Sequence, residues 1–163
     1  MAAVKFSSLK RFPIADWFLL PVVFILLGAA RGAVLILPFK YYSRLIGRKV
    51  AFDLANRELT NQQFKRAVRI GRLIRTVARN TPWQSLCLPQ AMVASILLWV
   101  YGIGQVTYFG LSRNSENLKA KGLDPLLAHA WVMAGDLPVT GGHGHRHYTV
   151  VASFGRTLQA EVQ

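Results

Sequence analysis

Apolar and polar positions follow a helical period through much of the first half of the chain. The segment 64–79, FKRAVRIGRLIRTVAR, places one apolar stripe among its arginines, formed by Ile70, Leu73, Ile74 and Val77. Thr60 stands where an N-cap is expected, so the basic helix should begin just after it. The segment 89–101 is apolar on nearly every face, which predicts a buried central helix with Pro89 at its first position.

The second half changes to the pattern of short strands separated by turn residues. Strands are expected at 105–113, 126–133, 137–140 and 147–154. A polar loop, NSENLKAKGLDP, follows the first strand, a turn at 134–136 separates the second and third, and GGHGHR interrupts the return. Helices followed by an apolar helix packed on an antiparallel sheet predict an α+β fold. A break at Asn80-Thr81-Pro82 divides the chain into a helical N-terminal region, 1–80, and a core, 81–163, and we expect the two to form one compact unit.

The N-terminal apolar segment admits several interpretations. An uncharged run from Trp17 to Ala30 follows basic residues and ends in small ones, as in a signal peptide. The run is shorter than the ~20 residues that a membrane span needs. We expect two buried helices, roughly 14–30 and 32–47, with the second passing through Pro38, and a peripheral membrane association stays open.

The charge narrows the classes of partner. The chain has 20 Lys and Arg against 7 Asp and Glu, a net charge of +13. This excess favours an anionic membrane face, a nucleic acid or an acidic peptide as partner. No recognised nucleic-acid-binding motif accompanies the charge, so we expect no nucleic-acid partner. The basic helix itself is explained most simply as a core-packing helix with a solvated face.

The first candidate catalytic residue is Cys87. It is the only cysteine in the chain, so an internal disulfide framework and any Cys-rich metal site are excluded. A thiol at the start of a helix meets unpaired N–H groups and the positive end of the helix dipole, which favour the thiolate. A nucleophilic thiol also needs a base. Among four histidines, only His129 lies inside a clean apolar strand, AHAWV. The alternative is that Cys87 is a small buried hydrophobe and His129 is simply hydrogen-bonded.

The order of a helix-opening cysteine, a strand histidine and a further strand resembles the transglutaminase-like, papain-related arrangement. In detail, LPFKYYSRLIGR, PWQSLCLPQAMVASILL, QVTYFGLSR, LLAHAWVMAGD and VTGG with HYTVVASF look like the B proteins of lasso-peptide biosynthesis. The resemblance implies a transglutaminase/papain-like core and a cysteine peptidase, with Cys87 as nucleophile and His129 as base. Its implied substrate is a ribosomally made precursor, from which the enzyme removes the leader and frees the core.

The resemblance also implies partners. The family holds the leader in a small strand-containing recognition domain, whereas the residues before Cys87 here have helical patterns. The chain is therefore similar to the stand-alone peptidase half, and should need a separate leader-recognition protein and an ATP-dependent lasso cyclase. No cofactor and no metal are implied. The expected location is the cytoplasm, with peripheral contact at the inner membrane left open.

One part of the family pattern is missing. The family places an aspartate about twelve residues after the histidine, and Gly141 stands at that position. A hairpin centred on Gly135 would pair position 141 with 129. Three arrangements stay open: the dyad acts alone, the backbone or Thr140 holds the imidazole, or one of the later histidines replaces the acid. We favour the backbone or Thr140, because a histidine supplies no negative charge.

Further side chains are assigned by their place around the dyad. Gln84 is a candidate oxyanion donor, although the backbone N–H of Cys87 is the safer one. Trp83 and Trp131 are expected to wall the cleft. His143 and His145, in the glycine-rich GHGHRH stretch, are expected to lie in a basic loop that reaches the substrate. The segment 105–109 is a candidate edge for peptide docking.

Three other functions remain open. On a regular strand, His143, His145 and His147 would share one face and could bind zinc, which predicts a His-rich metal-binding protein. The apolar N-terminus and basic helix also suit a membrane-associated scaffold without peptidase activity. Acyl transfer to an amine would keep the fold and change only the acceptor.

Overall fold

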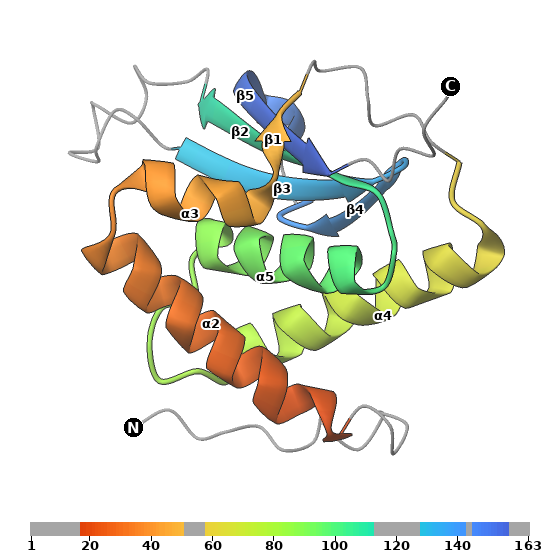
Figure 1. Ribbon diagram of the computed structural model, residues 1–163, viewed down its shortest axis with the longest axis horizontal. Helices are drawn as coiled ribbons and strands as arrows, with labels where there is room; N and C mark the ends of the chain where they lie inside the picture. The colour runs from red at the N-terminus through yellow and green to blue at the C-terminus, as the bar shows by residue number, and fades with distance from the viewer. Residues whose placement is uncertain (1–16, 51–57, 113–127, 143–144, 157–163) are drawn as a thin grey trace.

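The computed structural model describes residues 17–50, 58–112, 128–142 and 145–156 (Figure 1). Its helices are α2 (Leu19–Ile36), α3 (Phe39–Ile46), α4 (Asn61–Ala78), α5 (Cys87–Val100) and the short 3-10 helix η2 (His145–His147). Its strands are β1 (Arg48–Lys49), β2 (Gln105–Ser112), β3 (Ala128–Ala134), β4 (Leu137–Thr140) and β5 (Tyr148–Arg156). The predicted polar loop falls in 113–127, outside the described residues.

The strands form one antiparallel sheet in the order β1-β5-β2-β3-β4. Helix α5 lies against one face of this sheet, and α2 and α4 pack on the other side of α5 (Figure 1). The fold is therefore α+β, as the sequence predicts. A single cluster of buried apolar side chains includes residues from α2, α4, α5, β3 and β4, so residues on both sides of position 80 contribute to one core. The division at 80–81 stays a prediction.

Helix α5 is the centre of the core, and most of its side chains are buried, as predicted from its apolar sequence. The helix begins at Cys87, two residues before the expected start at Pro89. Leu86 is extended, with φ −66° and ψ 172°, and serves as the N-cap. Pro89 is tolerated in the first turn because a backbone N–H there has no partner within the helix. This earlier start places the thiol on the first helical residue.

The N-terminal helices differ from the prediction in where they break. Helix α2 continues through Arg31 and ends at Ile36, and α3 begins after Pro38. The expected passage of a helix through Pro38 is wrong, because a proline disfavours helical dihedrals in the preceding residue, here Leu37 with ψ 141°.

The expectation that α2 is buried holds only for one stripe, formed by Val23, Leu27 and Ala30. The other faces leave large apolar side chains exposed. By length and composition alone the helix is sufficient to cross a membrane. Only 17% of its residues are buried inside the protein. Helix α2 therefore covers α5 on one side and presents an apolar surface on the others.

Helix α4 starts with a complete capping box. Thr60 Oγ1 accepts from the backbone N–H of Gln63, and Gln63 Oε1 accepts from the backbone N–H of Thr60. Further along, Gly71 lets the helix approach β4, since a Cβ there would lie 2.4 Å from the Val139 carbonyl oxygen. Arg75 donates to that same oxygen at 3.0 Å. Helix α4 thus covers the β4 edge of the sheet.

The expectation of a docking edge at 105–109 is wrong. Strand β2 pairs with β3 on one side and with β5 on the other, so its backbone groups are used inside the sheet. Periodicity identified the strand, but sheet order is set by long-range pairing that the local pattern does not specify.

Candidate active site

Cys87 lies at the first position of α5, where its half-buried Sγ meets three hydrogen-bonding groups. His129 interacts with Sγ through its side chain, and the backbone N–H groups of Leu88 and Ala130 donate to it. Leu88 comes from the first turn of α5, whose N–H groups have no helical acceptors. Ala130 belongs to β3, two positions beyond the first residue of the strand. The helix start and the neighbouring strand together create an environment for a thiolate.

His129 is held from the opposite side by a backbone carbonyl. Its Nε2 lies 2.8 Å from the Gly141 oxygen. A carbonyl oxygen only accepts, so Nε2 carries the hydrogen and Nδ1 is left to face Cys87. The ring also packs against Trp131 and Tyr148, at centroid distances of 5.9 and 4.9 Å. The imidazole is thereby fixed in one tautomer and one orientation.

The hairpin register differs from the prediction. The turn pairs Ala134 with Leu137 and Met133 with Pro138, and a bulge then pairs Val132 with Thr140. Gly141 therefore does not lie directly opposite His129, as expected from a turn centred on Gly135. The imidazole reaches the Gly141 carbonyl diagonally, within the range of a long side chain across neighbouring strands. A bulge shifts register by one residue, which the alternation of apolar residues did not reveal.

Gly141 has no room for the aspartate that the family pattern places there. Its φ is +68°, a left-handed conformation that favours glycine. A Cβ would lie 2.5 Å from the Ala130 carbonyl oxygen and 2.9 Å from Trp131 Cα. The backbone of residue 141 itself replaces the missing side chain, because the same residue supplies the carbonyl that holds His129.

Thr140, the other candidate orienter, does not hold the imidazole. Its side chain is buried at 1% exposure, and among the described residues its Oγ1 has no hydrogen-bond partner. The structure instead supports the backbone as the group that orients the imidazole, through the Gly141 carbonyl.

The pKa values of the pair move toward each other. Burial alone raises the pKa of the Cys87 thiol, but the hydrogen bond with His129, the N–H of Ala130, the imidazole charge and the N–H of Leu88 outweigh it, and the net pKa is lowered. The hydrogen bond with Cys87 raises the pKa of His129, burial opposes this, and the Gly141 carbonyl adds to the rise. Both shifts favour a thiolate–imidazolium pair.

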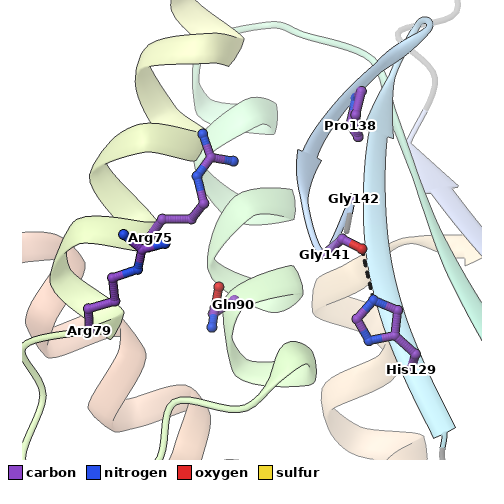
Figure 2. Close-up of a pocket in the computed structure, with 7 residues that line it drawn as sticks. All are labelled: Arg75, Arg79, Gln90, His129, Pro138, Gly141 and Gly142. Atoms are coloured by element: carbon purple, nitrogen blue, oxygen red, sulfur yellow. Dashed lines mark hydrogen bonds between the residues drawn. The ribbon is translucent and has the colours of Figure 1, made fainter. Parts of the chain in front are cut away.

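A pocket of about 530 Å³ opens beside His129. Figure 2 shows Arg75 and Arg79 on the α4 side, His129 and Gly141 on the sheet side, and Gln90 between them. Pro138 and Gly142 complete the lining. The sequence pattern does not select Gln90 or the two arginines as site residues. It places the arginines on the solvated face of the basic helix and Gln90 in the apolar helix.

Gln90 also ties down the loop that precedes the thiol. Its Nε2 donates to the Ser85 carbonyl at 2.7 Å. The Ser85 hydroxyl in turn lies 2.8 Å from Thr81 Oγ1. The loop from the end of α4 to Cys87 is held by these side chains, which fixes where α5 begins.

The two tryptophans lie in different places. Trp131 is buried beside the dyad, and its ring stacks against the rings of Tyr108 and His129. Trp83 instead packs against α2, with its ring 5.1 Å from that of Phe24, and does not line the pocket. Its expected role as a cleft wall finds no support in this pocket and stays a prediction. Gln84 has an exposed side chain and is not among the pocket residues.

The histidine-rich stretch does not form a regular strand where it is described. His145 and His147 lie in the 3-10 helix η2, His145 Nδ1 is 2.7 Å from the Gly142 oxygen, and its ring lies 5.9 Å from that of Trp131. His143 falls outside the described residues. Within the described part of the chain, no group of three His, Cys, Asp or Glu residues has metal-binding geometry.

Comparison with known proteins agrees with this geometry. Residues 33–153 match the family model of the transglutaminase-like superfamily. No curated protein and no solved structure gives a significant match. The match includes both residues of the dyad and covers most of the described fold, so the chain belongs to the transglutaminase-like superfamily, which includes cysteine peptidases.

Proposed function

We propose that the protein is a cysteine peptidase that removes the leader from a lasso-peptide precursor. The observation that carries the peptidase is the contact of Cys87 with an imidazole whose other nitrogen is held by the Gly141 carbonyl. The lasso-peptide assignment rests on the sequence resemblance, chiefly CLPQA and AHAWV in this order. A separate leader-recognition protein would deliver the precursor, and an ATP-dependent cyclase would take the freed core.

The proposed reaction starts from the thiolate. Cys87 Sγ attacks the carbonyl carbon of the scissile amide, and the backbone N–H of Cys87 donates to the oxyanion that forms. His129 then gives the Nδ1 proton to the leaving amine, the C–N bond breaks, and the core departs with a free amino terminus. The leader stays bound as a thioester.

Water completes the cycle. His129, now neutral, takes a proton from water as the water attacks the thioester carbon. The C–S bond breaks, the leader leaves with a new carboxyl group that loses its proton to solvent, and the thiolate–imidazolium pair is restored. Throughout, the Gly141 carbonyl keeps Nε2 protonated, so that Nδ1 is the atom that transfers the proton.

The direct test mixes the protein with its candidate precursor and leader-binding partner and follows peptide masses. Wild type should release intact leader and core, and Cys87→Ala should release neither, because no other cysteine is present to replace the nucleophile. Adding a primary amine separates hydrolysis from acyl transfer, since a leader mass increased by the mass of the amine less one water would identify transfer. Release by Cys87→Ala at the wild-type rate would refute the peptidase proposal, and activity that a chelator abolishes would favour a metal centre.

We also propose that the protein acts at the anionic inner face of the membrane. Helix α2 exposes large apolar side chains, including Ile25 at 67%, Leu35 at 67% and Ile36 at 81%, in a chain of net charge +13. Wild type should co-sediment with vesicles containing phosphatidylglycerol and not with neutral phosphatidylcholine vesicles. Ile25→Glu should weaken this binding, whereas Lys65→Gln, on α4, should change it little; binding unaffected by Ile25→Glu would contradict the proposal.

A further inference from the structure

The pocket beside the dyad contains two positive charges that the proposed reaction does not use. Arg75 lies in the last turn of α4 and Arg79 is the C-cap residue of the helix, one helical turn later, so their side chains extend from the same face. Both line the cavity that His129 and Gly141 close on the other side (Figure 2). The cavity of about 530 Å³ lies within the range of ligand pockets, about 300–1,000 Å³.

The two guanidinium groups have no acidic partner in the described part of the chain. Glu58 and Asp136 are the only carboxylate side chains there, and neither forms an ion pair with Arg75 or Arg79. Burial, and then the charge of Arg79, lowers the pKa of Arg75. Both arginine side chains are exposed overall, so solvent screens part of their repulsion, and an anion that binds both would relieve the rest.

The hydrogen bonding of Arg75 fixes its position and leaves donors for a ligand. One of its terminal nitrogens donates to the Val139 carbonyl at 3.0 Å, which anchors the guanidinium against the edge of β4. A guanidinium has five N–H donors in a planar fork, and carboxylates match this fork with two parallel bonds. Arg75 is therefore preorganised, and Arg79 adds a second charge from the solvent side.

We propose that Arg75 and Arg79 form a carboxylate-binding subsite next to the dyad, so that the enzyme selects peptides with a carboxylate near the scissile bond. The inference rests on the proposed peptidase function and specifies its substrate class. The carboxylate belongs either to an aspartate or glutamate side chain or to the new terminus of the released leader. In both cases it lies across the pocket from His129 and fixes the position of the peptide.

The experiment measures binding without requiring turnover. Cys87 is the only thiol, so its alkylation by iodoacetamide, followed by intact mass, reports occupancy of the site. The probes are N-acetyl-Gly-Glu-Gly amide, the matching Gln peptide amide, and N-acetyl-Gly-Gln-Gly with a free carboxylate. They are tested on wild type, on Arg79→Gln, and on Lys65→Gln, which removes an exposed charge from the same helix but not from the pocket.

A carboxylate peptide should protect the wild-type thiol at a concentration about tenfold lower than the neutral peptide does, the effect of one charge-assisted hydrogen bond. The difference should disappear in Arg79→Gln and persist in Lys65→Gln. Protection by the Glu peptide assigns the subsite to a substrate side chain, and protection by the free acid assigns it to the product terminus. Equal protection by all three peptides on wild type, or equal loss in both variants, would overturn the subsite.

This inference and the peptidase proposal fail in different ways. Carboxylate-dependent protection in a protein that releases no leader from the precursor would refute the peptidase and leave the subsite in place. Release of the leader together with equal protection by acidic and neutral peptides would refute the subsite and leave the peptidase.

Discussion

Replacing His129 with alanine is expected to lower kcat/KM for leader release by about 10²–10⁴-fold, the usual contribution of a positioned general acid–base. It should also reduce alkylation of Cys87 at neutral pH. Without the imidazole, burial continues to raise the pKa of the thiol, and only the N–H groups of Leu88 and Ala130 oppose it. The midpoint of the alkylation rate against pH should therefore move upward.

The pH dependence of the wild type follows from the direction of the two shifts. The lowered thiol pKa places the acid limb of kcat/KM below the usual value for a free thiol, about 8.5. The raised pKa of His129 places the alkaline limb above about 6.5, since the leaving amine needs a protonated imidazole. Peptide cleavage should be bell-shaped, whereas alkylation should rise to a plateau, because it needs the thiolate alone. The apparent values belong to the pair.

His147→Ala is the matched control. It also removes an imidazole, but the side chain is exposed and lies in η2. Its alkylation profile should superimpose on that of the wild type. If His129→Ala gave the same profile as His147→Ala, the thiolate would depend on the helix start alone and the dyad would be wrong.

Replacing Gly141 with alanine is expected to damage both stability and activity. A left-handed φ costs a residue with a Cβ about 1–2 kcal/mol, and overpacking against Ala130 and Trp131 adds about 1–3 kcal/mol. Denaturant unfolding should show the free energy of unfolding lowered by the sum, roughly 2–5 kcal/mol. Displacement of the carbonyl that holds His129 should lower kcat/KM of the folded protein by about 100-fold, as measured well below the unfolding midpoint.

Gly32→Ala is the control for this change, since no atom lies within 4 Å of a Cβ at that position in α2. Alanine there should raise the free energy of unfolding by up to about 1 kcal/mol and leave activity unchanged. Gly141→Asp restores the residue that the family pattern places there, yet it should behave like Gly141→Ala. Higher activity in Gly141→Asp than in wild type would show that the backbone yields and that the carbonyl is a poor substitute for the acid.

Local sequence was sufficient wherever one element determines its own structure. The N-cap at Thr60, the apolar stripe of α4, the apolar α5 and all of β4 follow from side-chain chemistry at short range. The break after α2 was misplaced because the apolar pattern continues to Ile36 and only the proline at position 38 ends the helix.

The dyad was predictable for a related reason. A thiol is activated by a helix start, and a titratable ring in an apolar strand requires a partner, so Cys87 and His129 could be selected from residue types and positions. Their contact is part of the tertiary structure, in which α5 packs against β3.

The sequence by itself therefore determined most of the element types and was sufficient to select Cys87 and His129 as the candidate nucleophile and base. The tertiary structure decided what holds that base, because a bulge in the β3–β4 pairing turns the Gly141 carbonyl toward His129, and register depends on pairing across strands. The tertiary structure also decided the charge of the pocket. The close approach of α4 to β4 brings Arg75 and Arg79 to the wall of the pocket that faces the imidazole. Side-chain periodicity reports which face of an element is buried, but not which other element lies against it.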